Sequence, residues 1–138
     1  CYVSRSWPAS IAPHCFDPEG AATIMRIHMR QVELRHRGVS HDDEEREIQA
    51  GLSSGQFRLP RRPVLSWMMS AGQELVNDSG RPVGAWQPHI MIYYPWLTAE
   101  ETGLTGPPDL GHAVLNDAGR PTANLMVVVK EFVQPRTW

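Results

Sequence analysis

Apolar residues recur every three or four positions in the segment 18–37, and this spacing predicts an amphipathic helix. Asp17 can accept hydrogen bonds from the free amides at the start of this helix, and Pro18 suits its first position. Gly38 is suited to end it, because glycine readily adopts the left-handed conformation found after helices. The predicted buried stripe consists of Ala21, Ile24, Met25, His28 and Val32.

A second helix is predicted to begin at Ser40, whose hydroxyl can cap the first turn with Asp43 as a partner three residues later. Ile48 and Leu52 lie one turn apart and supply its apolar contact, and Gly55 is a suitable stop. Because the link between the two helices is short, they are expected to form a helical hairpin.

After residue 57 the pattern changes to short apolar runs separated by turn residues, which is typical of strands. The best strand candidates are residues 64–70, 88–94 and 124–132, with weaker candidates at 2–4 and 112–115. Residues 5–16 are interpreted as a loop with two prolines. These elements predict a single α+β domain over residues 1–138, in which the helical hairpin packs on a mainly antiparallel sheet of about four strands.

A six-residue segment occurs twice, as NDSGRP at 77–82 and NDAGRP at 116–121. Asn, Asp and Gly tolerate positive φ, so both copies are predicted to be hairpin turns. Neither copy has enough ligands for a calcium loop. Residues 98–101 (TAEE) form a further capping box, which predicts one short helical turn.

Alternation along the three best strands sorts their side chains onto two faces. One face carries the larger aliphatic set, and we expect it to pack against the helical hairpin. It consists of Leu65, Trp67, Met69, Ile90, Ile92, Leu125, Val127 and Val129.

The opposite face of these strands combines thioether, imidazole, phenol and hydroxyl groups, which is unusual for a core and indicates a recognition surface. Methionine is adaptable enough to serve there either as filler or as a contact to a ligand. The candidate ligand-binding residues are Ser66, Met68, Trp86, His89, Met91 and Tyr93.

His89 is the central residue of this candidate site, since an imidazole can donate a hydrogen bond, act as a base or bind a metal. A hydrolase would need Ser66 or Ser70 with His89 and Asp109, but the GxSxG motif is absent. The Met25, His28 and Met29 group has the composition of a copper site, although its helical spacing favours a place in the core. The sequence therefore assigns no catalytic residue, metal site or cofactor.

The 138 residues carry a formal charge of −2, which gives no electrostatic reason to expect a nucleic-acid partner. No apolar run approaches the roughly 20 residues that a membrane-spanning helix needs. Cys1 and Cys15 are the two cysteines, and three interpretations are open: a disulfide between them, two free thiols, or lipidation of Cys1. Cysteines this close together in the sequence can readily pair, and a disulfide is typical of a protein matured outside the cytosol.

Four segments resemble a group of exported bacterial proteins with no assigned activity. They are CFDPEG at 15–20, preceded by Cys1, and RPVLSWMMS at 62–70, PHIMIYY at 88–94 and ANLMVVV at 123–129. The resemblance implies a signal peptide and further strands upstream of Cys1. It also implies export and the Cys1–Cys15 disulfide.

The sequence thus predicts a periplasmic or secreted, non-enzymatic domain that binds a small apolar ligand or a protein partner through the face with Met68, His89, Met91 and Tyr93. Two alternatives remain at this point. One is a hydrolase or metal-dependent enzyme that uses His89. The other is an accessory subunit of a cell-envelope complex. The oligomeric state is left open.

Overall fold

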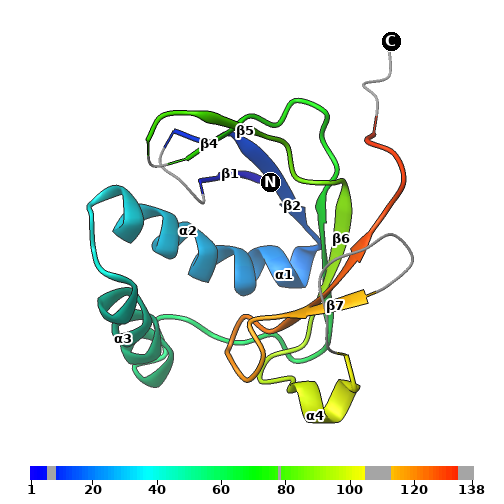
Figure 1. Ribbon diagram of the computed structural model, residues 1–138. Helices are drawn as coiled ribbons and strands as arrows, with labels where there is room; N and C mark the ends of the chain where they lie inside the picture. Colours follow the sequence, from blue (N-terminus) through cyan, green and yellow to red (C-terminus); the bar gives the residue numbers. More distant parts are fainter. Residues whose placement is uncertain (6–8, 78, 105–112, 134–138) are drawn as a thin grey trace.

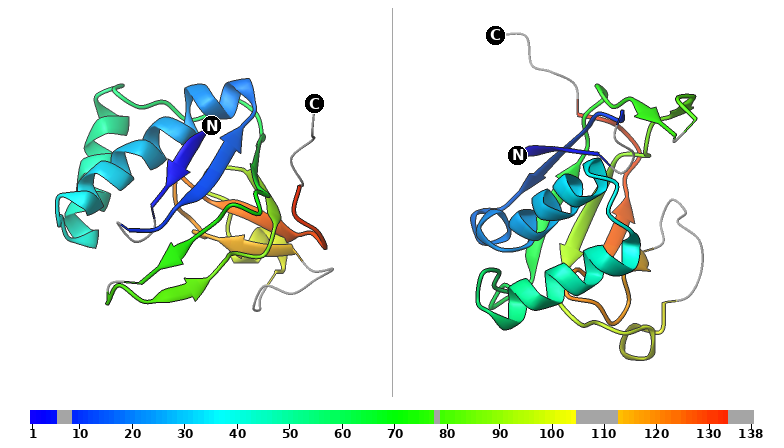
Figure 2. Two further views of the ribbon diagram at one scale, coloured as in Figure 1. Left: turned by 90° about the horizontal axis from the view of Figure 1, so that it is seen from above. Right: turned by 90° about the vertical axis from the view of Figure 1, so that its left-hand side faces the viewer.

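The computed structural model describes residues 1–5, 9–77, 79–104 and 113–133. Its main element is a twisted six-stranded sheet with the order β1-β2-β3-β6-β8-β7, in which each pair of neighbours is antiparallel. Helices cover one face of this sheet (Figures 1 and 2). The six strands are β1 (Tyr2–Ser4), β2 (Ala12–Phe16), β3 (Val64–Met68), β6 (His89–Tyr93), β7 (Ala113–Asn116) and β8 (Asn124–Val128).

The predicted mixed α+β class and antiparallel sheet are confirmed, but the expected number of about four strands is wrong. The main omission is β2, which lies in the segment interpreted as a loop because it contains Pro13. Proline has no amide to donate, so it is tolerated only at certain places in a sheet. Here it lies opposite Val3 in the short pairing between β1 and β2.

The helical hairpin is confirmed, although its first helix is interrupted. The structure has α1 (Pro18–Ala22) and α2 (Ile24–His36), followed by α3 (His41–Ser53) and the short α4 (Ala99–Thr102). The break occurs at the buried Thr23, whose hydroxyl donates to the carbonyl of Glu19 at 2.6 Å. Side-chain bonds of this kind compete with the helical pattern. Of the predicted stripe, Ile24 is buried, whereas Ala21, Met25, His28 and Val32 are only partly buried. The other buried positions of α2 are Ile27 and Leu34.

The predicted helix ends are confirmed. Asp17 Oδ1 accepts a hydrogen bond from the Gly20 amide at 2.7 Å, and the Ser40 hydroxyl accepts one from the Asp43 amide at 3.2 Å. Gly38 has φ of 74°, which is the left-handed conformation expected after α2. The Thr98 capping box is also present at the start of α4.

Both copies of the repeated segment lie in hairpin turns, as predicted. The first connects β4 (Leu75–Val76) to β5 (Pro82–Gly84), which form a separate two-stranded sheet. The second connects β7 to β8 and contains Asp117 and Gly119, both with positive φ. Asp78 lies outside the described residues.

The expected packing of the sheet is wrong in one important respect. The two side-chain faces are as predicted, but the helices cover the face that carries Ser66, His89 and Tyr93. On β3, Val64 and Ser66 have no exposed surface, whereas Leu65 is 40% exposed. The count of aliphatic residues misled the prediction because methionine and tyrosine also bury large apolar areas, provided that their polar atoms find partners.

Two clusters of buried apolar residues hold these layers together. One joins α2 to the sheet through Ile24, Val64, Met91 and Tyr93, and the other joins α2 to α3 through Ile27, Ile48 and Phe57. The predicted contact of α3 through Ile48 and Leu52 is therefore confirmed.

An ion pair with a buried carboxylate reinforces the junction between α2 and α3. Arg35 of α2 donates two hydrogen bonds to the carboxylate of Glu44 of α3, at 2.7 and 2.8 Å. Paired donation of this kind is the favoured geometry of arginine with a carboxylate, and it satisfies the buried Glu44.

Cys1 and Cys15 form a disulfide, as predicted. It ties the start of β1 to β2, next to the pairing of Tyr2 with His14. The disulfide therefore anchors a strand that has only one partner in the sheet.

Replacement of both cysteines by serine is expected to lower the free energy of unfolding by about 3 kcal/mol. Without the disulfide, the unfolded chain can adopt more conformations and is therefore more stable. Urea denaturation of the variant and of the oxidised wild type measures this difference. Wild-type protein treated with a reductant is the matched control and should show the same loss. An unchanged free energy of unfolding in both would contradict the proposed role of the disulfide.

Candidate functional site

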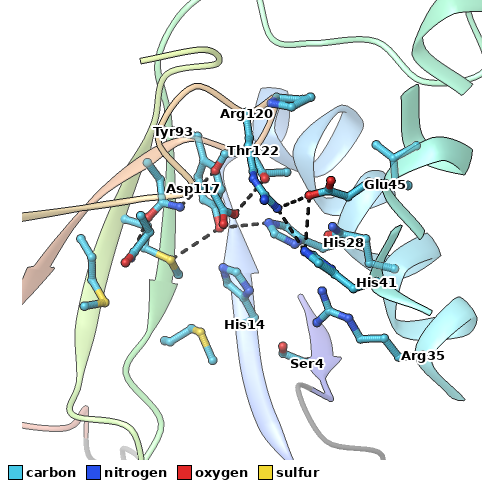
Figure 3. A pocket seen from close by; sticks show the side chains of 18 of the residues that line it. Ser4, His14, His28, Arg35, His41, Glu45, Tyr93, Asp117, Arg120 and Thr122 are labelled. Carbon is cyan, nitrogen blue, oxygen red and sulfur yellow. Dashed lines mark hydrogen bonds and ion pairs between the residues drawn. The ribbon is translucent and has the colours of Figure 1, made fainter. Parts of the chain in front are cut away.

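A cavity of about 570 Å³ lies between the helical hairpin and the covered face of the sheet (Figure 3). Strands β1, β2, β3, β6 and β8 supply one wall, and α2 and α3 supply the opposite wall. The end of β7 and the β7–β8 turn supply a third side, through Asn116, Asp117, Gly119, Arg120, Pro121 and Thr122. The cavity therefore combines side chains from both ends of the described chain.

Five of the six candidate ligand-binding residues line this cavity: Met68, Trp86, His89, Met91 and Tyr93. The strand alternation brings four of them together, and Trp86 precedes β6. Ser66 lies behind this wall with no exposed surface. Its hydroxyl is hydrogen bonded to His14 Nε2 at 2.9 Å, so Ser66 positions a lining residue.

His14 of β2 is the centre of a buried polar chain that sequence reasoning missed. Its Nδ1 lies 3.2 Å from the Tyr2 hydroxyl, and its Nε2 is bonded to Ser66. Burial lowers the pKa of His14 to about 2, and the nearby His28 and His89 act in the same direction. His14 is consequently neutral at pH 7, and one of its ring nitrogens donates while the other accepts.

His28 of α2 joins the helix to the sheet through a hydrogen bond with the Tyr93 hydroxyl, at 3.0 Å. The Tyr93 hydroxyl in turn donates to Met91 Sδ at 3.5 Å, which leaves its oxygen to accept from His28 Nε2–H. Burial lowers the pKa of His28 to about 4 and raises the pKa of Tyr93 well above its usual value. Both side chains are therefore uncharged at pH 7.

His89 presents a free ring nitrogen within the wall of the cavity. Its Nδ1 lies 2.6 Å from the backbone carbonyl of Gln87, and a carbonyl can only accept, so Nδ1 carries the proton. Burial lowers the pKa of His89, and the ring is therefore neutral at pH 7. Its Nε2 keeps a lone pair for which the described part of the chain supplies no hydrogen-bond donor.

Both arginines that line the cavity are held in ion pairs. Arg35 is held by the buried Glu44, and Arg120 forms an ion pair with Glu45 at the end nearest the helices (Figure 3). Asp117 accepts a hydrogen bond from the Thr122 hydroxyl at 2.9 Å. Both arginines among the described lining residues are thus held in ion pairs, and Asp117 is the lining carboxylate whose partner is a neutral hydroxyl. His14, His28 and His89 add no charge at pH 7.

Two tryptophans lie at the surface of the cavity, Trp86 with 38% of its area exposed and Trp96 with 47%. Trp96 has φ of 68°, a conformation that a bulky residue rarely adopts. Its amide donates to the carbonyl of Arg120 at 2.9 Å, which ties it to the turn that carries Asp117. Backbone strain of this kind is found most often at functional sites.

Several lining residues escaped prediction because their place depends on contacts between distant segments. Tyr2 and His14 line the cavity only because β1 and β2 join the sheet, and Asp117 and Arg120 belong to a segment interpreted as a plain turn. The alternation of Ala12, His14 and Phe16 was the available signal for β2.

The other chemical interpretations of the sequence find little support in the geometry. The buried Ser66 engages His14, and Asp109 of the hydrolase hypothesis lies outside the described residues. Of the copper-like group, His28 lines the cavity while Met29 is exposed. Within the described ranges, no group of three or more His, Cys, Asp or Glu side chains is placed to hold a metal ion.

No family model matches the chain, and no curated protein or solved structure shows a significant match. The resemblance to exported bacterial proteins therefore stays a prediction. None of the helices in the described part of the chain has the length and apolar character needed to cross a bilayer.

Replacement of Tyr93 by phenylalanine is expected to lower the free energy of unfolding by about 1–3 kcal/mol, because the buried His28 N–H loses its acceptor. Tyr94→Phe is the matched control, since Tyr94 is exposed, and it should change stability by less than about 0.5 kcal/mol. Urea denaturation measures both values. Equal losses in the two variants would show that the His28–Tyr93 bond does not hold the helix on the sheet.

Proposed function

We propose that this chain is an exported, non-enzymatic domain that binds a small molecule in the cavity between the helical hairpin and the sheet. The observation that carries this proposal is the cavity itself. Its volume of about 570 Å³ lies within the range of about 300–1,000 Å³ typical of small-molecule sites. A concave, partly enclosed site of this kind favours a small ligand over a protein partner.

The lining residues favour a ligand with an apolar body and a few uncharged polar groups. Met68, Met91 and Met126 offer adaptable apolar contacts, and the exposed indoles offer flat ones. Since both arginines of the lining are ion paired, an anionic ligand would lack a matching partner. Neutral imidazoles and protonated phenols supply hydrogen bonds to uncharged groups.

The electrostatics of the histidines favour binding over acid–base catalysis. A general base works best with a pKa near the working pH, whereas the pKa values of His14 and His28 lie near 2 and 4. Ser66, the serine nearest to these histidines along the sheet, is fully buried. These features support a binding role and weigh against acid–base catalysis by His14 or His28.

Export is the second part of the proposal, and the Cys1–Cys15 disulfide supports it. Disulfides persist in oxidising compartments and are rare in the cytosol. We therefore place the protein in the periplasm or outside the cell.

The proposal is tested with N-phenyl-1-naphthylamine, an uncharged apolar probe whose fluorescence rises when it leaves water. The wild type should bind it saturably. Met126→Trp fills the cavity and should weaken binding at least tenfold, whereas Leu125→Trp should leave it unchanged. Leu125 is a close control, because it is the adjacent residue of β8 and points to the opposite face.

Unchanged binding in Met126→Trp, or an equal loss in both variants, would contradict a ligand site in the cavity. Thermal unfolding of both variants checks that each retains the fold.

A further inference from the structure

His89 has the features of a metal-binding histidine. Its Nδ1–H donates to a backbone carbonyl, which fixes the ring and leaves the Nε2 lone pair free. Metal-ligating histidines usually donate their second ring nitrogen in this way. The residue is only 4% exposed, and it lines both the large cavity and a neighbouring cavity of about 210 Å³.

Two methionines are neighbours of His89 on the same face of the sheet. Met68 of β3 is directly opposite His89 of β6 in the strand register, where side chains are neighbours. Met126 of β8 is diagonal to His89, since its direct partner is Met91. Met126 and His89 also share the smaller cavity, whose lining among the described residues is Trp86, Gln87, His89, Met126 and Val128.

Met91 is set apart from this group by its contact with the Tyr93 hydroxyl, which donates to its sulfur. The remaining soft donors are thus Met68 Sδ, Met126 Sδ and His89 Nε2. The planes of the Trp86 and His89 rings are 71° apart, with 6.4 Å between ring centroids. An indole at this position can cover a bound cation, because its face attracts positive charge.

We propose that His89 Nε2, Met68 Sδ and Met126 Sδ bind a soft monovalent metal ion, copper(I), beneath Trp86. Thioether ligands select copper(I), whereas zinc(II) prefers thiolate, imidazole and carboxylate. Both cysteines are in the disulfide, so no thiolate competes for the ion. This proposal does not depend on the small-molecule function.

The test uses copper(I) supplied anaerobically as its bicinchoninate complex, with ascorbate as the reductant so that no thiol is added. The oxidised full chain should take one copper(I) per molecule and lose tryptophan fluorescence. His89→Ala, Met68→Leu and Met126→Leu should each weaken binding at least tenfold. Met→Leu changes the donor atom while nearly conserving volume, so these variants are expected to fold.

His36→Ala and Met29→Leu are the matched controls, because they change the same residue types at exposed positions of α2. Both should bind copper(I) as the wild type does. X-ray absorption of the wild-type complex should show two sulfur neighbours and one nitrogen neighbour, which keeps the test decisive if a variant unfolds. The proposal is overturned if the wild type takes no copper(I) from the chelator, or if the control variants lose as much copper(I) affinity as the ligand variants. It is also overturned if the bound copper has only nitrogen and oxygen neighbours, or if the protein binds zinc(II) as strongly as copper(I).

Discussion

The hydrogen bond between His28 of α2 and Tyr93 of β6 joins the two layers of the fold. The bond forms only when the helical hairpin packs on the face of the sheet that carries Tyr93, so it favours that face over the opposite one. That face carries polar atoms, which are stable in the interior only when they are hydrogen bonded. His14 with Ser66 and Arg35 with Glu44 meet the same requirement elsewhere in the layer. These pairs allow polar and apolar side chains to share one buried face, and the cavity lies among them.

The local features of the fold could be predicted from the sequence because neighbouring residues determine them. Asp17 and Ser40 cap helices through atoms only three residues away, and Gly38 ends α2 through its own backbone freedom. The strand cores at 64–68, 89–93 and 124–128 followed from their short apolar runs. The alternation of His89 with Ile90 was also correct, since it follows from the geometry of any strand.

The remaining features depend on contacts between segments far apart in the chain. Strand β2 is stabilised by pairing with β1 and β3. It was not predicted, because Pro13 made its segment resemble a loop. The prediction assigned the helices to the wrong face because it counted aliphatic residues alone. It did not consider the hydrogen bonds that stabilise buried tyrosine, histidine and serine side chains. The consequence is an outer sheet face with half-exposed aliphatic residues such as Leu65, while Tyr93 is buried. For the site, alternation found the residues of β3 and β6 but not those of β2, α2 and the β7–β8 turn.

The most direct test of whether the helices cover this polar face of the sheet is an NMR titration of the histidines. The ring-nitrogen resonances of His14 and His28 are followed as a function of pH. The account predicts that His28 titrates near pH 4 and that His14 stays neutral to still lower pH. Between pH 6.5 and about 4 the unfolded chain would then bind protons that the folded chain does not. The free energy of unfolding should fall there as the pH falls, by up to about 1.4 kcal/mol per pH unit for each histidine. Titration of both rings near pH 6.5 in the folded protein would contradict the account, because it would place this face of the sheet in contact with water.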